Sequence, residues 1–378
     1  LAFSGHRNEI YALTYSDDGQ LLISGGLDAN IILWDMQQGE FLSAFVTFAR
    51  TGVRSLADFN NTLYIAGETN EVVAVNIGFI PRFGTSLATT SEEILTSVIS
   101  QDDTVAYAGG TENDYDVYIL NDDNSEPTAL AYHSAFVTDL AWHDERLISV
   151  SVDRQVAIWE EGVLAHDIML NDGILSVASY DNLLAFGMNN GNIRLWDTTS
   201  SNYDNWSEIT ILDGHTGRIN DLSFNSDGTE LASVSRDNTL IIWDMATFEA
   251  RFEPLEGHTG AGIETARFHP IDPLIATGGR DTNIILWNTE TGEQLGPALV
   301  NHDNWVNDIA FSPDGQLMFS VSGDQSVIIW SVAEQRAIGL PFIGHANWIN
   351  SISASADNRS IITGGRDGML MRWDIDLT

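Results

Sequence analysis

The chain of 378 residues contains no cysteine, which excludes both a disulfide framework and a thiolate nucleophile or metal ligand. It contains no lysine either. All 16 basic residues are arginines, and against 54 acidic residues they leave a formal net charge of −38. No run of about 18 apolar residues occurs, so the sequence offers no membrane-spanning helix.

The shortage of basic residues decides which partners we expect. Binding to a phosphate backbone depends on cations that displace counterions, and a strongly negative field repels nucleic acid and anionic lipid. The sequence therefore predicts no nucleic-acid partner and no membrane insertion. The absence of lysine weakly favours an extracellular or cell-surface location over a cytoplasmic one. The sequence leaves the compartment otherwise open.

An internal repeat of about 42 residues runs through the chain. One copy reads LDGHTGRINDLSFNSDGTELASVSRDNTLIIWD and ends at Asp244. Three more copies align with it directly and end at Asn288, Ser331 and Asp374, and residues 3–35 and 132–160 are further copies. Residues 49–77, 93–121 and 163–197 keep the rhythm in degenerate form.

Each unit is predicted to consist of strands alone. In the copy quoted above, an alternating run from Ile219 to Phe224 precedes an Asp-Gly turn, which suits a hairpin that needs positive φ. A second run covers Leu231 to Val234. A third, Thr239 to Trp243, is almost continuously apolar, as expected of a strand buried on both faces.

The early Gly-His, the late Trp-Asp and the repeat length together resemble the WD-repeat family. The resemblance implies an all-β fold: one closed β-propeller of four-stranded antiparallel blades, formed by residues 1–378 as a single domain. Nine units are expected, with eight or seven as the alternatives, because propellers usually have four to eight blades. The third strands are expected to end near Trp34, Val75, Ile119, Trp159, Trp196, Trp243, Trp287, Trp330 and Trp373.

The two ends of the chain suggest how such a ring would close. The last unit stops near Trp373 without a fourth strand of its own, and Leu1 to Phe3 precede the first Gly-His as an outer strand would. We therefore expect the opening residues to complete the final blade, which would leave no sheet edge between the ends. The seven-bladed alternative would instead fold residues 45–125 in another way.

Histidine, serine or threonine, aspartate and tryptophan recur together in six units. The aspartate always lies four positions after the hydroxyl residue and the tryptophan six positions after the aspartate, so the pattern follows a building rule rather than marking a single catalytic site. The resemblance implies a buried hydrogen-bond network from indole through hydroxyl and imidazole to carboxylate. The six sets are His6, Ser24, Asp28, Trp34; His133, Ser149, Asp153, Trp159; His215, Ser233, Asp237, Trp243; His258, Thr277, Asp281, Trp287; His302, Ser320, Asp324, Trp330; and His345, Thr363, Asp367, Trp373.

No metal or cofactor site is predicted. The acidic stretch at residues 121–126 lacks the spaced oxygen pattern of a calcium loop and is expected to be a solvated loop. No histidine pair has zinc spacing, and no glycine-rich phosphate loop precedes a helix. We expect no enzyme activity.

A binding surface is expected where the loops before each first strand meet the residues that precede the network aspartates. Arginines precede the aspartate in three blades, and aromatic residues precede the first strand in three. Arginine and tryptophan on a rigid surface often carry binding energy. The candidate residues are Phe136, Arg218, Arg236, Arg280, Trp305, Trp348 and Arg366.

These features predict a scaffold that presents propeller loops to a protein or peptide partner, which could be a second copy of the chain. Two other functions remain open: a structural or cell-surface protein that assembles into an array or filament, and a recognition domain of a larger bacterial signalling protein.

Overall fold

The computed structural model describes residues 6, 8–16, 19, 21–36, 40–46, 52–59, 62–67, 72–76, 84–90, 93–109, 115–120, 127–260 and 262–375. Throughout these ranges the chain forms antiparallel β-sheets, with a single-turn 3-10 helix at Tyr203–Asn205. None of the helical segments in these ranges has the length and apolar character needed to cross a bilayer.

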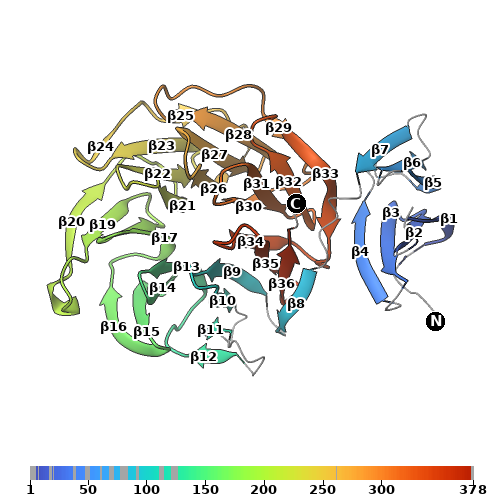
Figure 1. The fold of residues 1–378 in the computed structure, drawn as a ribbon. Helices are drawn as coiled ribbons and strands as arrows, with labels where there is room; N and C mark the ends of the chain where they lie inside the picture. The colour runs from blue at the N-terminus through green and yellow to red at the C-terminus, as the bar shows by residue number, and fades with distance from the viewer. Residues whose placement is uncertain are drawn as a thin grey trace.

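Seven sheets are arranged in a ring around a central opening (Figure 1). Successive strands of each sheet run from the centre outward, and each first strand contacts the first strand of the next sheet. The strands of the first four ring sheets are β9 (Ile94–Ile99), β10 (Val105–Gly109), β11 (Val117–Ile119), β12 (Thr128–Leu130); β13 (Val137–His143), β14 (Arg146–Ser151), β15 (Gln155–Glu160), β16 (Val163–Met169); β17 (Ile174–Tyr180), β18 (Leu183–Met188), β19 (Ile193–Asp197), β20 (Ser207–Leu212); and β21 (Ile219–Phe224), β22 (Glu230–Ser235), β23 (Thr239–Asp244), with β24 (Glu249–Ala250) and β25 (Leu255–Glu256) both paired to β23.

The last three ring sheets complete the circle. Their strands are β26 (Ile263–Phe268), β27 (Leu274–Gly279), β28 (Asn283–Asn288), β29 (Leu299–Val300); β30 (Val306–Phe311), β31 (Leu317–Ser322), β32 (Ser326–Ser331), β33 (Arg336–Ile343); and β34 (Ile349–Ala354), β35 (Ser360–Gly365), β36 (Met369–Asp374), with β8 (Gly84–Thr89) as the fourth strand. Apolar clusters fill the space between neighbouring sheets. One cluster joins Ile94 and Tyr107 of the first ring sheet to Ile362 and Leu370 of the last.

The ring differs from the predicted nine-bladed closure. In the described residues the outer partner of β36 is β8, with Met369 opposite Thr89 and Trp373 opposite Gly84. The expected closure by Leu1 to Phe3 is therefore wrong, because the edge that these residues would pair with is already occupied; they themselves lie outside the described residues. The seven-bladed alternative gives the number of ring sheets but not their residues, because β9 to β11, which it would fold in another way, belong to a ring sheet.

Two further blades lie outside the ring, at the right of Figure 1. They are β1 (Ile10–Tyr15), β2 (Leu21–Gly26), β3 (Asn30–Asp35), β4 (Glu40–Val46); and β5 (Val53–Phe59), β6 (Thr62–Gly67), β7 (Val72–Asn76). We call them the N-terminal blade pair. The outer strand β4 meets the outer strand β33 of the ring through a bridge between Ala44 and Ile343.

The contact between neighbouring ring blades, which we call the blade joint, repeats the same polar contacts. Each first strand carries a bulge near its start. At the bulge Asn220, Asn307 and Asn350 donate to the first carbonyl of the next blade's first strand at 2.7–2.8 Å. Because Asn350 bonds to Ile94 O, the last and first ring blades are joined in the same way as the others.

A second set of contacts crosses the joints next to the central opening. Asp139, Asp221 and Asp308 each accept a hydrogen bond from a backbone N–H of the next blade at 2.9–3.0 Å. Arg267 projects from β26 between two of them, paired with Asp221 and 3.2 Å from Asp308. Burial and the charge of Asp221 raise the pKa of Asp139 to about 7, against its hydrogen bonds and the charge of Arg267. The guanidinium group thus offsets part of a negative cluster.

We predict that Arg267→Met destabilises the protein, because Asp221 and Asp308 would remain close together without a counter-charge. The expected loss is about 2–3 kcal/mol, less than for a fully enclosed ion pair because the Arg267 side chain is 33% exposed. Urea unfolding measures it. The control is Arg336→Met, which breaks an exposed ion pair with Glu334 and should cost less than about 1 kcal/mol. Equal losses in the two variants would contradict the role of Arg267.

Candidate protein-binding surface

The six recurring polar sets are each joined by hydrogen bonds. The indole Nε1–H donates to the serine or threonine hydroxyl at 2.8–2.9 Å. The hydroxyl oxygen lies 2.7–2.9 Å from the imidazole Nε2. The imidazole Nδ1 lies 2.8–3.2 Å from the carboxylate, so Nδ1–H donates to it and Nε2 accepts from the hydroxyl.

This geometry indicates that the six hydrogen-bonded sets have a structural role rather than a catalytic one. All six hydroxyl groups are buried, and each is already bonded to a tryptophan and a histidine. A serine nucleophile needs an accessible oxygen and an oxyanion hole, and these oxygens cannot reach a substrate. Each network instead connects the loop before the first strand, the second strand, the turn that follows it and the third strand of one blade.

The aspartate carboxylates carry the negative charge of these networks. Burial alone would raise the pKa of Asp324, but hydrogen bonds from His302, Ser326 and the Asp303 backbone lower it to about 2. Hydrogen bonds likewise outweigh burial at Asp153 and Asp281 and lower the pKa of each to about 2. The pKa values of Asp237 and Asp367 are lowered for the same reason.

Four of the candidate binding residues form a continuous row across three blades, which we call the Arg–Trp row. The guanidinium carbon of Arg280 lies 4.1 Å from the ring centroid of Trp305, and that of Arg366 lies 4.4 Å from the centroid of Trp348. The two indole rings meet edge to face with centroids 5.2 Å apart. Stacking of this kind restricts the side chains before any partner arrives.

Both arginines of the row also have acidic neighbours. Arg280 pairs with Glu264, and its side chain is largely enclosed. Arg366 is more exposed, with its Nε 3.8 Å from Glu93. Glu93 precedes β9 just as Trp305 and Trp348 precede β30 and β34. The sequence analysis missed both acids, although the place of Glu93 directly before a first strand could have revealed it.

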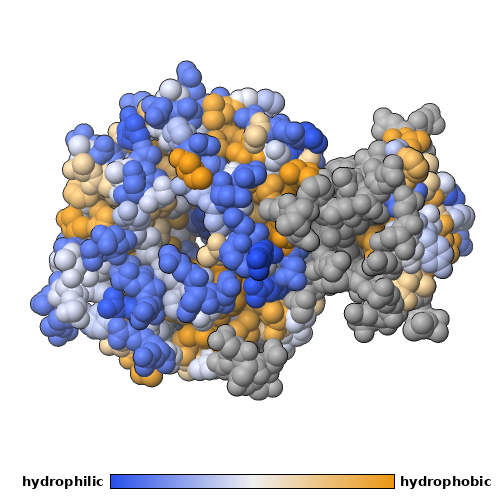
Figure 2. Space-filling view, viewed as in Figure 1, coloured by the Kyte–Doolittle hydropathy of each residue, from blue (hydrophilic) through white to orange (hydrophobic). Residues whose placement is uncertain are grey.

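The other three candidate residues are placed differently. Arg236 is exposed on the neighbouring blade. Arg218 donates to Asn220 at 3.0 Å, and its pKa is lowered by burial and by the nearby Arg280 and Arg236, against the opposing charge of Glu264. Phe136 packs edge to face on Tyr115, with the ring centroids 5.6 Å apart. Its blade does not contribute to the Arg–Trp row. Figure 2 shows one face of the ring, where hydrophilic residues surround the central opening.

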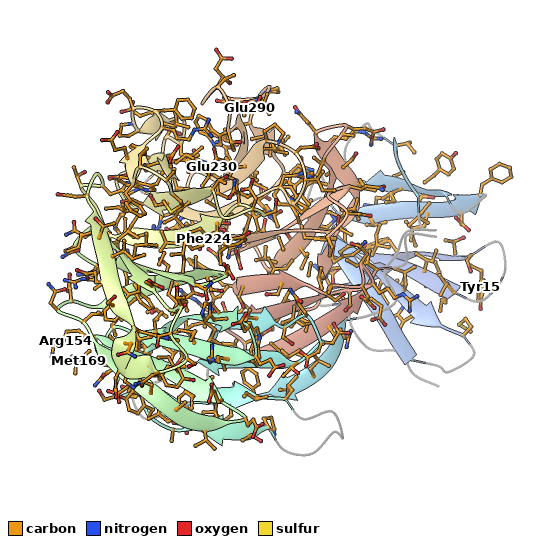
Figure 3. All side chains as sticks on the ribbon, turned by 60° about the vertical axis from the view of Figure 1, so that its left-hand side comes forward. Tyr15, Arg154, Met169, Phe224, Glu230 and Glu290 are labelled. Carbon is orange, nitrogen blue, oxygen red and sulfur yellow. The ribbon has the colours of Figure 1, made fainter. Side chains whose placement is uncertain are left out.

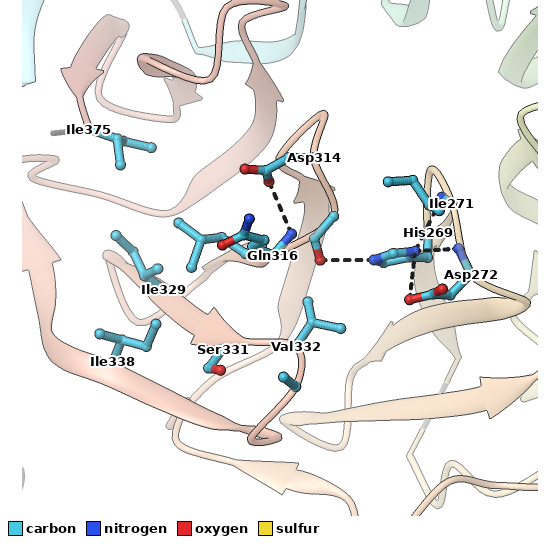
Figure 4. Close-up of a pocket in the computed structure, with 13 residues that line it drawn as sticks. His269, Ile271, Asp272, Asp314, Gln316, Ile329, Ser331, Val332, Ile338 and Ile375 are labelled. Atoms are coloured by element: carbon cyan, nitrogen blue, oxygen red, sulfur yellow. Dashed lines mark hydrogen bonds and ion pairs between the residues drawn. The ribbon is translucent and has the colours of Figure 1, made fainter. Parts of the chain in front are cut away.

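A separate cavity of about 670 Å³ lies between the turns at the opposite end of the blades (Figure 4). Its walls include Ile271, Ile329 and Ile338. His269 bonds to Gly315 O at 2.8 Å through Nε2 and accepts backbone N–H groups at Nδ1, so both ring nitrogens are occupied. Within the described ranges no three acidic or histidine side chains gather in a way that could hold a metal ion.

Comparison with known proteins agrees with this architecture. The family model described as "WD domain, G-beta repeat" matches residues 1–35, 206–244, 250–288, 294–331 and 338–374. The chain belongs to the WD-repeat family. A chain in a crystal structure of the mitotic checkpoint complex superposes on this WD-repeat protein with a TM-score of 0.69 at 23% identity, covering 82% of this chain and 96% of that one.

Known proteins are similar in sequence to parts of this WD-repeat protein. Nuclear distribution protein nudF of Aspergillus niger is 28% identical over 221 residues, which is 50% of this chain and 48% of nudF. Human apoptotic protease-activating factor 1 is 22% identical over 348 residues, or 84% of this chain and 25% of that protein. The chain therefore spans less than half the length of these two relatives.

The lowered carboxylate pKa values predict acid sensitivity of this WD-repeat protein. An aspartate with a pKa near 3.9 when unfolded and about 2 when folded stabilises the fold above pH 4, by about 2 kcal/mol, and loses that contribution as the pH falls to 2. Thermal melting between pH 5 and pH 2 should show a falling midpoint. Asp324→Asn should be less stable than the wild type at pH 7, and this difference should shrink below pH 4. A difference independent of pH would contradict the prediction.

Proposed function

We propose that this WD-repeat protein is a non-enzymatic scaffold that captures a protein or peptide partner on the Arg–Trp row and the adjacent Arg236. The observation that carries the proposal is the stacking of Arg280 on Trp305 and of Arg366 on Trp348, which holds four binding-prone side chains in one fixed array. A rigid array loses little conformational entropy on binding. Arginine and tryptophan are also the residue types most enriched among side chains that dominate binding energy.

The chemistry of the row favours a partner with carboxylate groups. Arg280 already pairs with Glu264, but the stacked guanidinium group of Arg366 is more exposed, and two in-plane N–H donors of such a group can bind one carboxylate together. Because the protein has a net charge of −38, an acidic partner would be repelled elsewhere and attracted where arginines gather. The similar propeller chain in the mitotic checkpoint complex, which belongs to a multi-protein assembly, supports a scaffold role.

We predict that Arg236→Glu combined with Arg366→Glu lowers partner affinity about tenfold or more, because both side chains are exposed and would turn repulsive. Arg280 is left unchanged, since a glutamate there would face Glu264 and destabilise the blade. Partners are first captured with the native protein and identified by mass spectrometry, and each is then titrated against both proteins.

The control is Arg336→Glu combined with Arg359→Glu, which makes the same change in net charge at exposed arginines away from the Arg–Trp row. It should bind like the wild type, and both double variants should remain folded in thermal melting, because all four arginines are exposed and lose only surface contacts. Unchanged affinity in the Arg236 and Arg366 variant, or equal losses in both variants, would reject the row as the binding surface.

A further inference from the structure

The N-terminal blade pair contains a blade joint of the same kind as the ring. Strand β5 packs on β1 and β2, and an apolar cluster that includes Ile23, Leu33, Val53 and Leu56 fills the space between the two sheets. The first strands β1 and β5 carry the same bulge as the ring blades. The pair therefore consists of two consecutive blades in register, with one complete joint between them.

The face of β1 that a preceding blade would cover is open. Leu13 is 62% exposed, whereas the residues at its place in the seven ring blades are at most 5% exposed. Ile10 is 50% exposed, against at most 1% for its ring counterparts. The counterparts of Leu13 are Ser97, Leu140, Val177, Leu222, Ala266, Ile309 and Ile352, and those of Ile10 are Ile94, Val137, Ile174, Ile219, Ile263, Val306 and Ile349.

The opposite face, which a following blade would cover, is open as well. Val72 of β7 is 66% exposed, and its counterparts in the ring are all 0% exposed. Tyr64 of β6 is 41% exposed, against at most 2% in the ring. The counterparts of Val72 are Val117, Val156, Ile193, Leu240, Ile284, Val327 and Leu370, and those of Tyr64 are Ala106, Ile148, Ala185, Ala232, Ala276, Phe319 and Ile362.

We propose that the N-terminal blade pair binds a second copy of this chain head to tail, with Ile10 and Leu13 of one copy against Tyr64 and Val72 of the other. The two open faces are the two halves of one blade joint, so a second copy supplies what each face lacks. The contact would continue the interface already present between β1 and β5. This surface is separate from the Arg–Trp row, and the proposal does not depend on the proposed function.

The ring does not block such a contact. Its strand β33 contacts the outer strands of the two blades, β4 and β7, while β1 and β5 lie at the inner edge. Figure 3 shows Tyr15 at the end of β1 on the side away from the ring. A head-to-tail contact uses different faces on the two copies, so it repeats from copy to copy and either closes into a ring or extends as a filament.

The first test is sedimentation velocity of the 378-residue protein over a wide range of concentrations. We expect species larger than a monomer whose fraction rises with concentration. Leu13→Arg and Val72→Arg should each reduce that fraction at least tenfold. Both side chains are exposed, so neither variant should lose the fold. The matched control is Ile271→Arg, at an equally exposed apolar residue on a ring turn, which should associate like the wild type.

The second test uses the absence of native cysteine. A Cβ atom placed on Gly25 would lie 2.8 Å from the Val53 Cβ across the joint of the blade pair, and Gly187 and Gly278 approach Ile219 and Val306 in the same way. Ala66 and Ile10 occupy these two places on the open faces. Their Cβ atoms should therefore come within disulfide range between copies.

Oxidation of a mixture of the Ala66→Cys and Ile10→Cys proteins should give a covalent dimer that neither variant forms alone. A protein that stays monomeric at every concentration would overturn the proposal, as would association that Leu13→Arg and Val72→Arg leave unchanged. Failure of the mixed cross-link in an associating protein would also overturn it, because the copies would then meet through another surface.

Discussion

The structure depends on the blade joint, in which an apolar residue at the start of each first strand packs against the sheet before it. Ile219, Ile263 and Ile349 occupy this place in three ring blades and are fully buried. Polar contacts at both ends of the joint set its register: Asn220 bonds to Ile263 O, and Asp221 accepts the backbone N–H of Ala266. Because the contacts run between consecutive blades, the joint can repeat until the first and last blades meet. The Asn350 bond to Ile94 O shows that they do so here through the same contact.

The same joint explains which parts of the fold the sequence could predict. The inner three strands of each blade carry the apolar periodicity and the His, Asp and Trp spacing, so their positions follow from the residues. The outer strands carry little of either, and β24 and β29 are only two residues long. An outer strand pairs mainly through its backbone, which is nearly independent of side chains. The sequence therefore could not decide whether Leu1–Phe3 or β8 would pair with β36, and for that reason it predicted one ring of nine blades where the structure has seven blades in the ring and two outside it.

The sequence predicted the binding surface to about the same extent as the fold. Spacing within the repeat assigned Arg280, Arg366, Trp305 and Trp348 to one end of the blades, since their distances from the network aspartates are fixed. Which arginine would stack on which indole depends on contacts between different blades. Arg280 stacks across a joint, whereas Arg366 stacks within its own blade and reaches Glu93 of the next. Such pairings require knowledge of which blades are neighbours, which again depends on how the ring closes.

The exposed apolar residues of the chain divide into two kinds, and the division follows from the blade joint. In the ring, Ile271 lies on a turn at the rim of the cavity and Val300 on an outer strand, outside the blade joints, where exposed apolar side chains are ordinary. In the N-terminal blade pair, Ile10, Leu13, Tyr64 and Val72 occupy the places that the joint buries in every ring blade. Exposed apolar residues at places that are otherwise buried typically mark a contact site. The ring joints are all filled, whereas the described residues of the blade pair leave one half-joint exposed on each side, and the chemistry of the two is complementary because both derive from the same repeat.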